Sequence, residues 1–219
     1  MIKALLFDMD GLLLDSERVV QRSWNIVGRI LGYESIGEHI YNTLGMNAAG
    51  REKYFNKAFG ECFPYEEFRK LTRDKFFEIA DSEGIPLKPG AKELILYAKQ
   101  MGYKVGLVTS SSRVYAKDIL ERAGIFKYFD GCIFGDMVTH SKPNPDIYIK
   151  ACELLGIEPE YCVAFEDSPA GVESATAAGV DVVMVPDLAE PDEETQFRAW
   201  KILGTLDEAI KILRMEARA

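Results

Sequence analysis

The most constraining feature of this sequence is the alternation of two patterns beyond residue 90. Short apolar runs bounded by turn residues alternate with longer segments whose apolar residues recur at helical spacing. Such alternation predicts right-handed crossovers and a parallel, doubly wound α/β sheet. The expected strands are 104–109, 131–135, 162–165 and 181–185, and the expected helices are 91–101, 114–123, 145–155, 169–178, 193–198 and a last one from 205.

The first residues are expected to join the same sheet. The run from Ile2 to Phe7 is apolar and leads into two carboxylates and a glycine. Residues 16–84 contain helical patterns but no convincing strand, and the Gly- and Pro-rich segment 84–90 follows them as a linker or hinge. We therefore expect a Rossmann-like core formed by residues 1–15 and 85–219, with an α-helical cap, residues 16–84, inserted into it.

Composition narrows the class of protein. The chain has 219 residues, 47% of them hydrophobic and 28% charged, which is ordinary for a soluble globular protein. Its net charge of −9 argues against nucleic-acid binding. No stretch is long and apolar enough to span a bilayer. Four scattered cysteines without a C-x-x-C pair predict reduced thiols packed in a core. We expect a cytoplasmic protein with no nucleic-acid or membrane partner and no obligate protein partner.

Asp8 and Asp10 follow the first expected strand, at the edge where parallel sheets bind ligands. Two carboxylates this close repel each other, and a divalent cation would offset the repulsion. Mg2+ is favoured when the substrate brings phosphate oxygens. An aspartate can also attack phosphorus, so we expect Asp8 to be the nucleophile and Asp10 to handle the proton. The alternative is an ordinary strand-to-loop turn. A calcium loop fits badly, because Gly11 stands fourth instead of sixth.

Three further strand ends carry polar side chains. Residues 109–112 offer hydroxyls and amides before a helix, which suits an anion, although Ser111 and Ser112 are expected only to cap that helix. Lys142 stands in a tight turn, where Asn144 is the expected N-cap and Pro145 the first helical residue. Lysines are usually solvated at the surface, but this placement favours an aimed side chain more than usual.

The fourth strand end carries Glu166 and Asp167. Like the first acidic pair they would need a cation, and Asp167 suits a third carboxylate of a Mg2+ site that keeps several waters. The four strand ends together supply a nucleophile, hydroxyl groups, a cation and metal ligands. They predict phosphoryl transfer.

This set resembles the haloacid dehalogenase superfamily of phosphohydrolases. The matching stretches, in the family's order, are F-D-M-D-G-L-L-L-D-S at 7–16, G-L-V-T-S at 106–110, S-K-P-N-P-D at 141–146 and F-E-D-S-P-A-G at 165–171. They look closest to the subgroup of beta-phosphoglucomutase and small sugar-phosphate phosphatases, whose helical cap follows the first motif. The resemblance implies a Mg2+-dependent phosphatase that hydrolyses a small phosphorylated metabolite, such as a sugar phosphate, through an aspartyl-phosphate intermediate.

The resemblance also implies roles for the first two motifs. Asp8 would be the nucleophile and a Mg2+ ligand. Asp10 would be the acid/base and would bind Mg2+ through its carbonyl. Dehalogenating members lack the second aspartate, so Asp10 points to phosphate esters. Thr109 and the Ser110 amide would hold the phosphoryl group.

The last two motifs complete the implied site. Lys142 would balance the charge at the phosphate-binding site, and Asp167, with Glu166, would hold the metal. In the cap, the segment Leu44–Asn47 and Arg51 lie where this subgroup contacts the rest of the substrate, with surface arginine as the alternative for Arg51.

Two other functions stay open at this point. The first is a phosphomutase, but a histidine that assists the mutase reaction in beta-phosphoglucomutase aligns with Val20, which favours net hydrolysis. The second is a non-catalytic receiver-like signalling module, which also combines acidic residues, a threonine and a lysine on a doubly wound sheet. The long cap and the order of the motifs argue against it.

Overall fold

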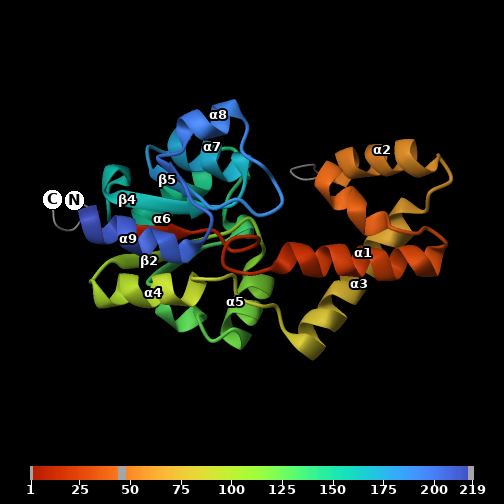
Figure 1. The fold of residues 1–219 in the computed structure, drawn as a ribbon, viewed down its shortest axis with the longest axis horizontal. Helices are drawn as coiled ribbons and strands as arrows, with labels where there is room; N and C mark the ends of the chain where they lie inside the picture. Colours follow the sequence, from red (N-terminus) through yellow and green to blue (C-terminus); the bar gives the residue numbers. More distant parts are fainter. Residues whose placement is uncertain (1, 44–47, 217–219) are drawn as a thin grey trace. The chain divides into compact units, whose positions relative to one another are not determined.

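The protein divides into two compact units, seen in a computed structural model that describes residues 2–43 and 48–216 (Figure 1). Met1–Asp15 and Pro86–Ala219 form one of them, called the sheet unit below. Ser16–Ile85 forms the other, the helical unit. Over the residues that are described, no helix combines the length and the apolar character that crossing a membrane would require.

The sheet unit is built on six strands, all paired in parallel, in the order β3-β2-β1-β4-β5-β6. The central strands β1 and β4 are buried along their whole length, because helices cover both faces of such a sheet. The predicted doubly wound parallel fold is therefore confirmed. The strands are β1 (Ala4–Phe7), β2 (Lys104–Val108), β3 (Gly131–Ile133), β4 (Cys162–Glu166), β5 (Asp181–Met184) and β6 (Lys201–Ile202).

Helices pack on the two faces of this sheet. α6 contacts β2 and β3, α7 contacts β4 and β5, and both share one apolar cluster with Ala4 and Leu6 of β1. α4 packs beside α9 and against β2 on the opposite face, as a right-handed connection from β1 to β2 requires (Figure 1). The helices of the sheet unit are α4 (Ala91–Gln100), α5 (Arg113–Arg122), α6 (Asp146–Leu155), α7 (Pro169–Ala177), α8 (Glu193–Arg198) and α9 (Leu206–Glu216), with short 3-10 turns η2 (Phe126–Tyr128), η3 (Gly135–Met137) and η4 (Pro159–Tyr161).

The strand register brings the motifs to one edge. β1 lies between β2 and β4, and Phe7 at its end pairs with Leu107 on one side and Phe165 on the other. Asp8, which follows Phe7, is therefore level with Val108 and Glu166. Because the chain order reverses direction at β1 and β4, this edge is also the switch point at which doubly wound sheets bind ligands.

The two segments that lead into and out of the helical unit lie side by side. The Asp15 N–H donates to the Pro86 carbonyl at 2.9 Å, and the Lys88 N–H donates to the Leu13 carbonyl at 2.9 Å. Leu14 and Leu87 form an antiparallel bridge between these bonds. Both connections therefore start from one short paired segment of the sheet unit.

The helical unit has an aromatic core. α1 (Ser16–Leu31) packs on α3 (Tyr65–Glu83) and on the 3-10 helix η1 (Ile36–Asn42), and α2 (Ala48–Phe59) completes the unit. Phe55 of α2 is fully buried at its centre. Aromatic rings surround Phe55 on several sides, namely those of Trp24, His39, Tyr54, Phe59, Phe63, Tyr65 and Phe68.

Most of the predicted elements are present, but some expectations are wrong. Strand β6 and helix η1 carry too few apolar residues in a regular pattern to be recognised. Helix α6 begins at Asp146 with Pro145 as its N-cap, so Asn144 does not cap it. All four cysteines are free, and Cys152 and Cys162 are buried, but Cys62 is exposed and does not pack in a core.

Candidate active site

Lys142 lies at the centre of a cluster of charged groups at the carboxyl edge of the sheet. Its Nζ donates to Asp8 Oδ1 at 2.6 Å, to Glu166 Oε1 at 2.6 Å and to the Val108 carbonyl at 3.1 Å. A lysine ammonium has three N–H donors, and these contacts use all of them. The three side chains are nearly inaccessible, with exposed fractions of 7% for Lys142, 10% for Asp8 and 1% for Glu166. Lys142 therefore acts here as a buried positive charge between two carboxylates.

Burial and charge determine the protonation of this cluster. Burial alone would lower the pKa of Lys142, but the nearby carboxylates of Asp8 and Glu166 outweigh it and raise the pKa. Burial raises the pKa of Glu166, and the Lys142 ammonium opposes that shift. Lys142 therefore keeps its proton and supplies one positive charge to the carboxyl groups around it.

Tyr148, which the sequence reasoning did not single out, also binds this cluster. Its hydroxyl donates to Glu166 Oε1. Tyr148 is fully buried on α6, and burial raises its pKa well above the usual value, so it remains a donor. The signal in the sequence was a tyrosine on the apolar face of the helix that follows Lys142, since a buried tyrosine hydroxyl needs a partner.

A third acid completes an oxygen-rich site. Carboxylate oxygens of Asp8, Glu166 and Asp167 lie within 4.8 Å of one another. Gly11 allows the first loop to approach Asp167: its φ is +83°, and a Cβ there would lie 2.1 Å from Asp167 Oδ2. Gly171 likewise allows α7 to approach Glu166, because a Cβ at Gly171 would lie 1.8 Å from Glu166 Oε2. Two glycines thus provide the space that brings the acids together.

The cluster suits a hard divalent cation. When all three acids are ionised, three carboxylates and one ammonium leave two negative charges, which one divalent ion would neutralise. Glu166 Oε2 is buried and has no hydrogen-bond partner among the described residues. Carboxylate oxygens are the donors that Mg2+ prefers. The residues present therefore fit such an ion.

Asp10 has hydroxyl partners of its own. Its Oδ2 accepts from the Ser111 hydroxyl at 2.7 Å, and its Oδ1 accepts from the Tyr115 hydroxyl at 3.3 Å. The expectation that Ser111 only caps α5 is wrong, because its side chain faces Asp10. Ser112 takes the N-cap position, although its side chain makes no capping bond. Tyr115 was missed, since its position in the first turn of α5 carries no sequence signal.

The hydroxyl motif follows β2 at the same edge. Thr109 is 1% exposed, and its Oγ1 accepts from the Ser111 N–H at 3.0 Å. Ser110 is exposed, and its carbonyl lies against Gly135, where a Cβ would be 2.0 Å away. The turn is therefore tightly fixed, with Ser110 open to solvent.

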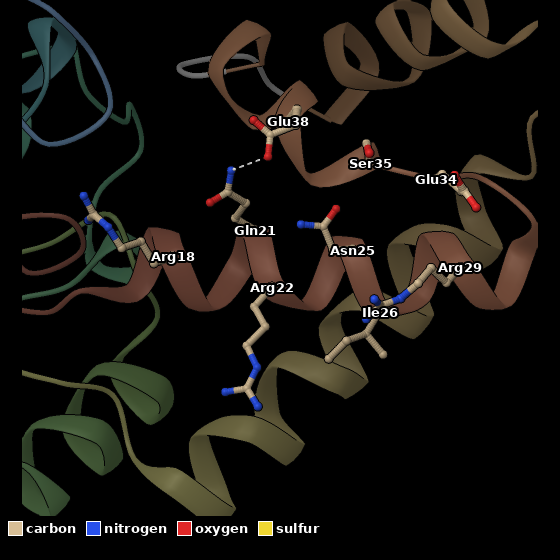
Figure 2. A pocket seen from close by; sticks show the side chains of 9 residues that line it. All are labelled: Arg18, Gln21, Arg22, Asn25, Ile26, Arg29, Glu34, Ser35 and Glu38. Atoms are coloured by element: carbon tan, nitrogen blue, oxygen red, sulfur yellow. Dashed lines mark hydrogen bonds between the residues drawn. The ribbon is translucent and has the colours of Figure 1, made fainter.

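The substrate residues expected in the cap belong to the helical unit. Arg51 is exposed on α2, and the segment Leu44–Asn47 lies outside the described residues. That unit has its own surface groove of about 770 Å³ along α1 (Figure 2). Gln21 points from α1 to Glu38, to which it donates at 3.5 Å. Among the described residues that were predicted for the site, none lines this groove.

Known proteins resemble this chain over most of its length. A family model described as haloacid dehalogenase-like hydrolase matches residues 2–179. Hexitol phosphatase A of Escherichia coli is 35% identical over 185 residues, which cover 84% of this chain and 82% of that protein. A phosphorylated carbohydrates phosphatase of Thermotoga maritima is 32% identical over 180 residues, which cover 82% of this chain and 83% of that protein.

The fold has solved counterparts as well. A crystal structure of a HAD family hydrolase from Deinococcus radiodurans, with bound phosphate and sodium, superposes with a TM-score of 0.84. It is 25% identical to this protein and covers 99% of this chain and 96% of its own. The resemblance drawn from the four motifs is thereby confirmed, and the chain belongs to the haloacid dehalogenase-like hydrolase family.

Proposed function

We propose that this enzyme, a phosphatase of its family, hydrolyses a small phosphorylated metabolite, most simply a sugar phosphate, with Mg2+ as its cofactor. One observation carries the proposal: Asp8 and Glu166 share the Lys142 ammonium beside Asp167, in a cluster of three acids and one ammonium. Two relatives named as phosphatases of hexitols and of phosphorylated carbohydrates support the substrate class.

Asp8 is the proposed nucleophile. Lys142 holds its Oδ1, which leaves the other carboxylate oxygen to attack phosphorus and form an aspartyl phosphate. Thr109 and the Ser110 amide would bind oxygens of the transferred phosphoryl group at the start of α5, where backbone N–H groups favour an anion. Lys142 would act mainly through its charge, since its three donors already have acceptors.

Asp10 is the proposed acid and base. It would give a proton to the departing alkoxide and then take one from the water that attacks the aspartyl phosphate. The carboxylates of Asp8 and Asp167, with Glu166 and the Asp10 carbonyl, would hold Mg2+. The ion supplies positive charge to the phosphate oxygens as negative charge develops on them. The helical unit would serve as a cap that excludes water during transfer, with Arg51 offered to the substrate.

Net hydrolysis is favoured over a phosphomutase reaction. Val20, which aligns with the histidine that assists the mutase, has no group that transfers protons. A hexose 1-phosphate should therefore release inorganic phosphate. Conversion to the 6-phosphate without phosphate release would instead assign mutase activity. Membership of a hydrolase family argues against the receiver-like alternative. We also propose that the enzyme is located in the cytoplasm and has no nucleic-acid, membrane or obligate protein partner.

The test is the variant Asp8→Asn, assayed with p-nitrophenyl phosphate and Mg2+. Loss of turnover is expected, because an amide cannot attack phosphorus. Rapid acid quenching of the wild-type enzyme with labelled substrate should also yield a label that neutral hydroxylamine removes from the protein. Undiminished turnover of Asp8→Asn would remove the mechanism. Asp136→Asn, at an acid of η3 outside the cluster, is the matched control.

A further inference from the structure

The carboxylate of Asp10 is held at both of its oxygens by hydroxyl groups from one short segment. The Ser111 hydroxyl donates to Oδ2 at 2.7 Å and the Tyr115 hydroxyl donates to Oδ1 at 3.3 Å. One donor on each oxygen restricts rotation about both side-chain torsions of the aspartate. Asp8 has a different kind of partner, because its Oδ1 accepts from the Lys142 ammonium.

The segment that carries these hydroxyls is itself fixed. The Ser111 N–H donates to Thr109 Oγ1 at 3.0 Å, and the Ser111 carbonyl accepts from the Gly135 N–H at 2.9 Å. Tyr115 lies four residues later, in the first turn of α5, whose N-cap is Ser112. Both hydroxyls therefore reach Asp10 from a rigid turn and the helix that it starts.

We propose that Ser111 and Tyr115 are positioning residues, which orient the Asp10 carboxyl for proton transfer to the leaving group. This inference rests on the proposed role of Asp10 as the acid. A protonated carboxyl group keeps acceptor positions on its oxygens, so both hydroxyls can go on donating to Asp10 while its own proton points to the departing oxygen. General acid catalysis depends on such geometry, because the proton must lie within hydrogen-bond reach of the departing oxygen.

The nature of the leaving group provides the test. A sugar alkoxide needs a proton as it leaves, whereas p-nitrophenolate leaves without one. The value of kcat/KM reports the steps up to loss of the leaving group. The measurement is kcat/KM for p-nitrophenyl phosphate and for the alkyl phosphate that the wild-type enzyme turns over fastest, from a panel that starts with glycerol 2-phosphate and glucose 6-phosphate. The alkyl-to-aryl ratio of these values isolates the acid.

Loss of either hydroxyl should lower this ratio. Ser111→Ala is expected to lower it about tenfold, because a good hydrogen bond to a carboxylate is lost. Tyr115→Phe, which removes the longer bond, should lower it about threefold. Ser111→Thr keeps the hydroxyl and should restore most of the ratio. Ser112→Ala, the neighbouring serine without a capping bond, and Tyr128→Phe are matched controls that should leave it unchanged.

Asp10→Asn separates this inference from the proposed function. If Asp10→Asn lowers the ratio and neither Ser111→Ala nor Tyr115→Phe does, the positioning role is overturned while the proposed function stands. If Asp10→Asn leaves the ratio unchanged, Asp10 is not the acid, and both its proposed role and this inference fail, whereas the Asp8→Asn assay still decides whether the enzyme is a phosphatase with Asp8 as its nucleophile. A general structural defect is recognised because it lowers both values of kcat/KM equally and leaves their ratio at the wild-type value, which also contradicts the inference.

Discussion

The two units of this protein treat buried polar groups in opposite ways. In the sheet unit, the buried polar residues include two acids, Asp8 and Glu166, held by a nearly inaccessible lysine. In the helical unit, the buried polar side chains of the described residues are neutral hydroxyls. Several of these simply bond to carbonyls of their own helices, as Ser23 does to Val20 and Thr72 to Phe68.

This difference indicates which unit gives up folding stability for the proposed reaction. Burying like charges costs stability unless a partner compensates them. The sheet unit accepts that cost at one edge, where the proposed reaction takes place. The helical unit instead buries aromatic rings around Phe55 and keeps its described ion pairs exposed. Substitutions in the two units should therefore affect different observables.

The largest effect is expected from Lys142→Met. It leaves the carboxylates of Asp8 and Glu166 close together without their shared cation. We expect kcat/KM to fall by about 10³-fold and the free energy of unfolding to fall by about 3 kcal/mol, measured by phosphate release and urea unfolding. Adding Glu166→Gln should recover part of the stability but not the activity. The control is Lys92→Met at an exposed position of α4. Wild-type activity in Lys142→Met would contradict the claim that the buried charges of the sheet unit serve the reaction.

Phe55→Ala tests the helical unit. It removes a fully buried ring and should lower the free energy of unfolding by about 4 kcal/mol. Because the acids lie in the other unit, Mg2+ binding at temperatures where the variant is folded should remain, as titration calorimetry can measure. Phe197→Ala is the control, since that ring is 91% exposed. Loss of Mg2+ binding by folded Phe55→Ala would show that the two units are not energetically separate in this respect.

Gly11→Ala should have a smaller effect on stability. A Cβ at this position meets both a positive φ and the Asp167 carboxylate at 2.1 Å. Gly102→Ala is a matched control, because its φ is +81° and a Cβ there would have no atom of the described residues within 4 Å. We expect a loss of about 1 kcal/mol for Gly102→Ala and about 2 kcal/mol for Gly11→Ala. Only Gly11→Ala should weaken Mg2+ binding in calorimetry. Equal effects on that binding would contradict the close-approach argument.

The smallest effect is expected from Arg22→Met. The Arg22 guanidinium contacts both oxygens of Glu83, at 2.6 Å and 2.8 Å, but the two side chains are 53% and 52% exposed. Solvent screens such a pair strongly. The midpoint of urea unfolding should therefore move by far less than in Phe55→Ala. A shift of comparable size would mean that surface charge, and not only the aromatic core, stabilises the helical unit.

The sequence indicated the sheet better than it indicated the details of the site. Apolar runs such as Ala4–Phe7 and Cys162–Glu166 are visible locally, and parallel pairing then places Asp8 level with Glu166 by register. The contacts of Tyr148 and Tyr115 depend on which way a helix face turns after packing. Periodicity locates a buried face but not the partner of a hydroxyl on it.

Side-chain direction also decided the outcome for the serines. Ser111 and Ser112 are equivalent as capping residues in the sequence, and only the tertiary structure turns Ser111 to Asp10. The acids were easier to predict, because like charges after neighbouring strands require compensation wherever they meet. Their assignment to Mg2+, and that of Arg51 to the substrate, stays a prediction.

The paired segment formed by Leu13–Asp15 and Pro86–Lys88 has an evolutionary consequence. The chain leaves the sheet unit and returns to it at adjacent points. The segment between these points can therefore be exchanged or shortened without a change in the strand order of the sheet. A hairpin-length replacement of residues 16–85 would still close the loop at that place. The architecture thus allows one reactive edge to be combined with insertions of quite different size and composition.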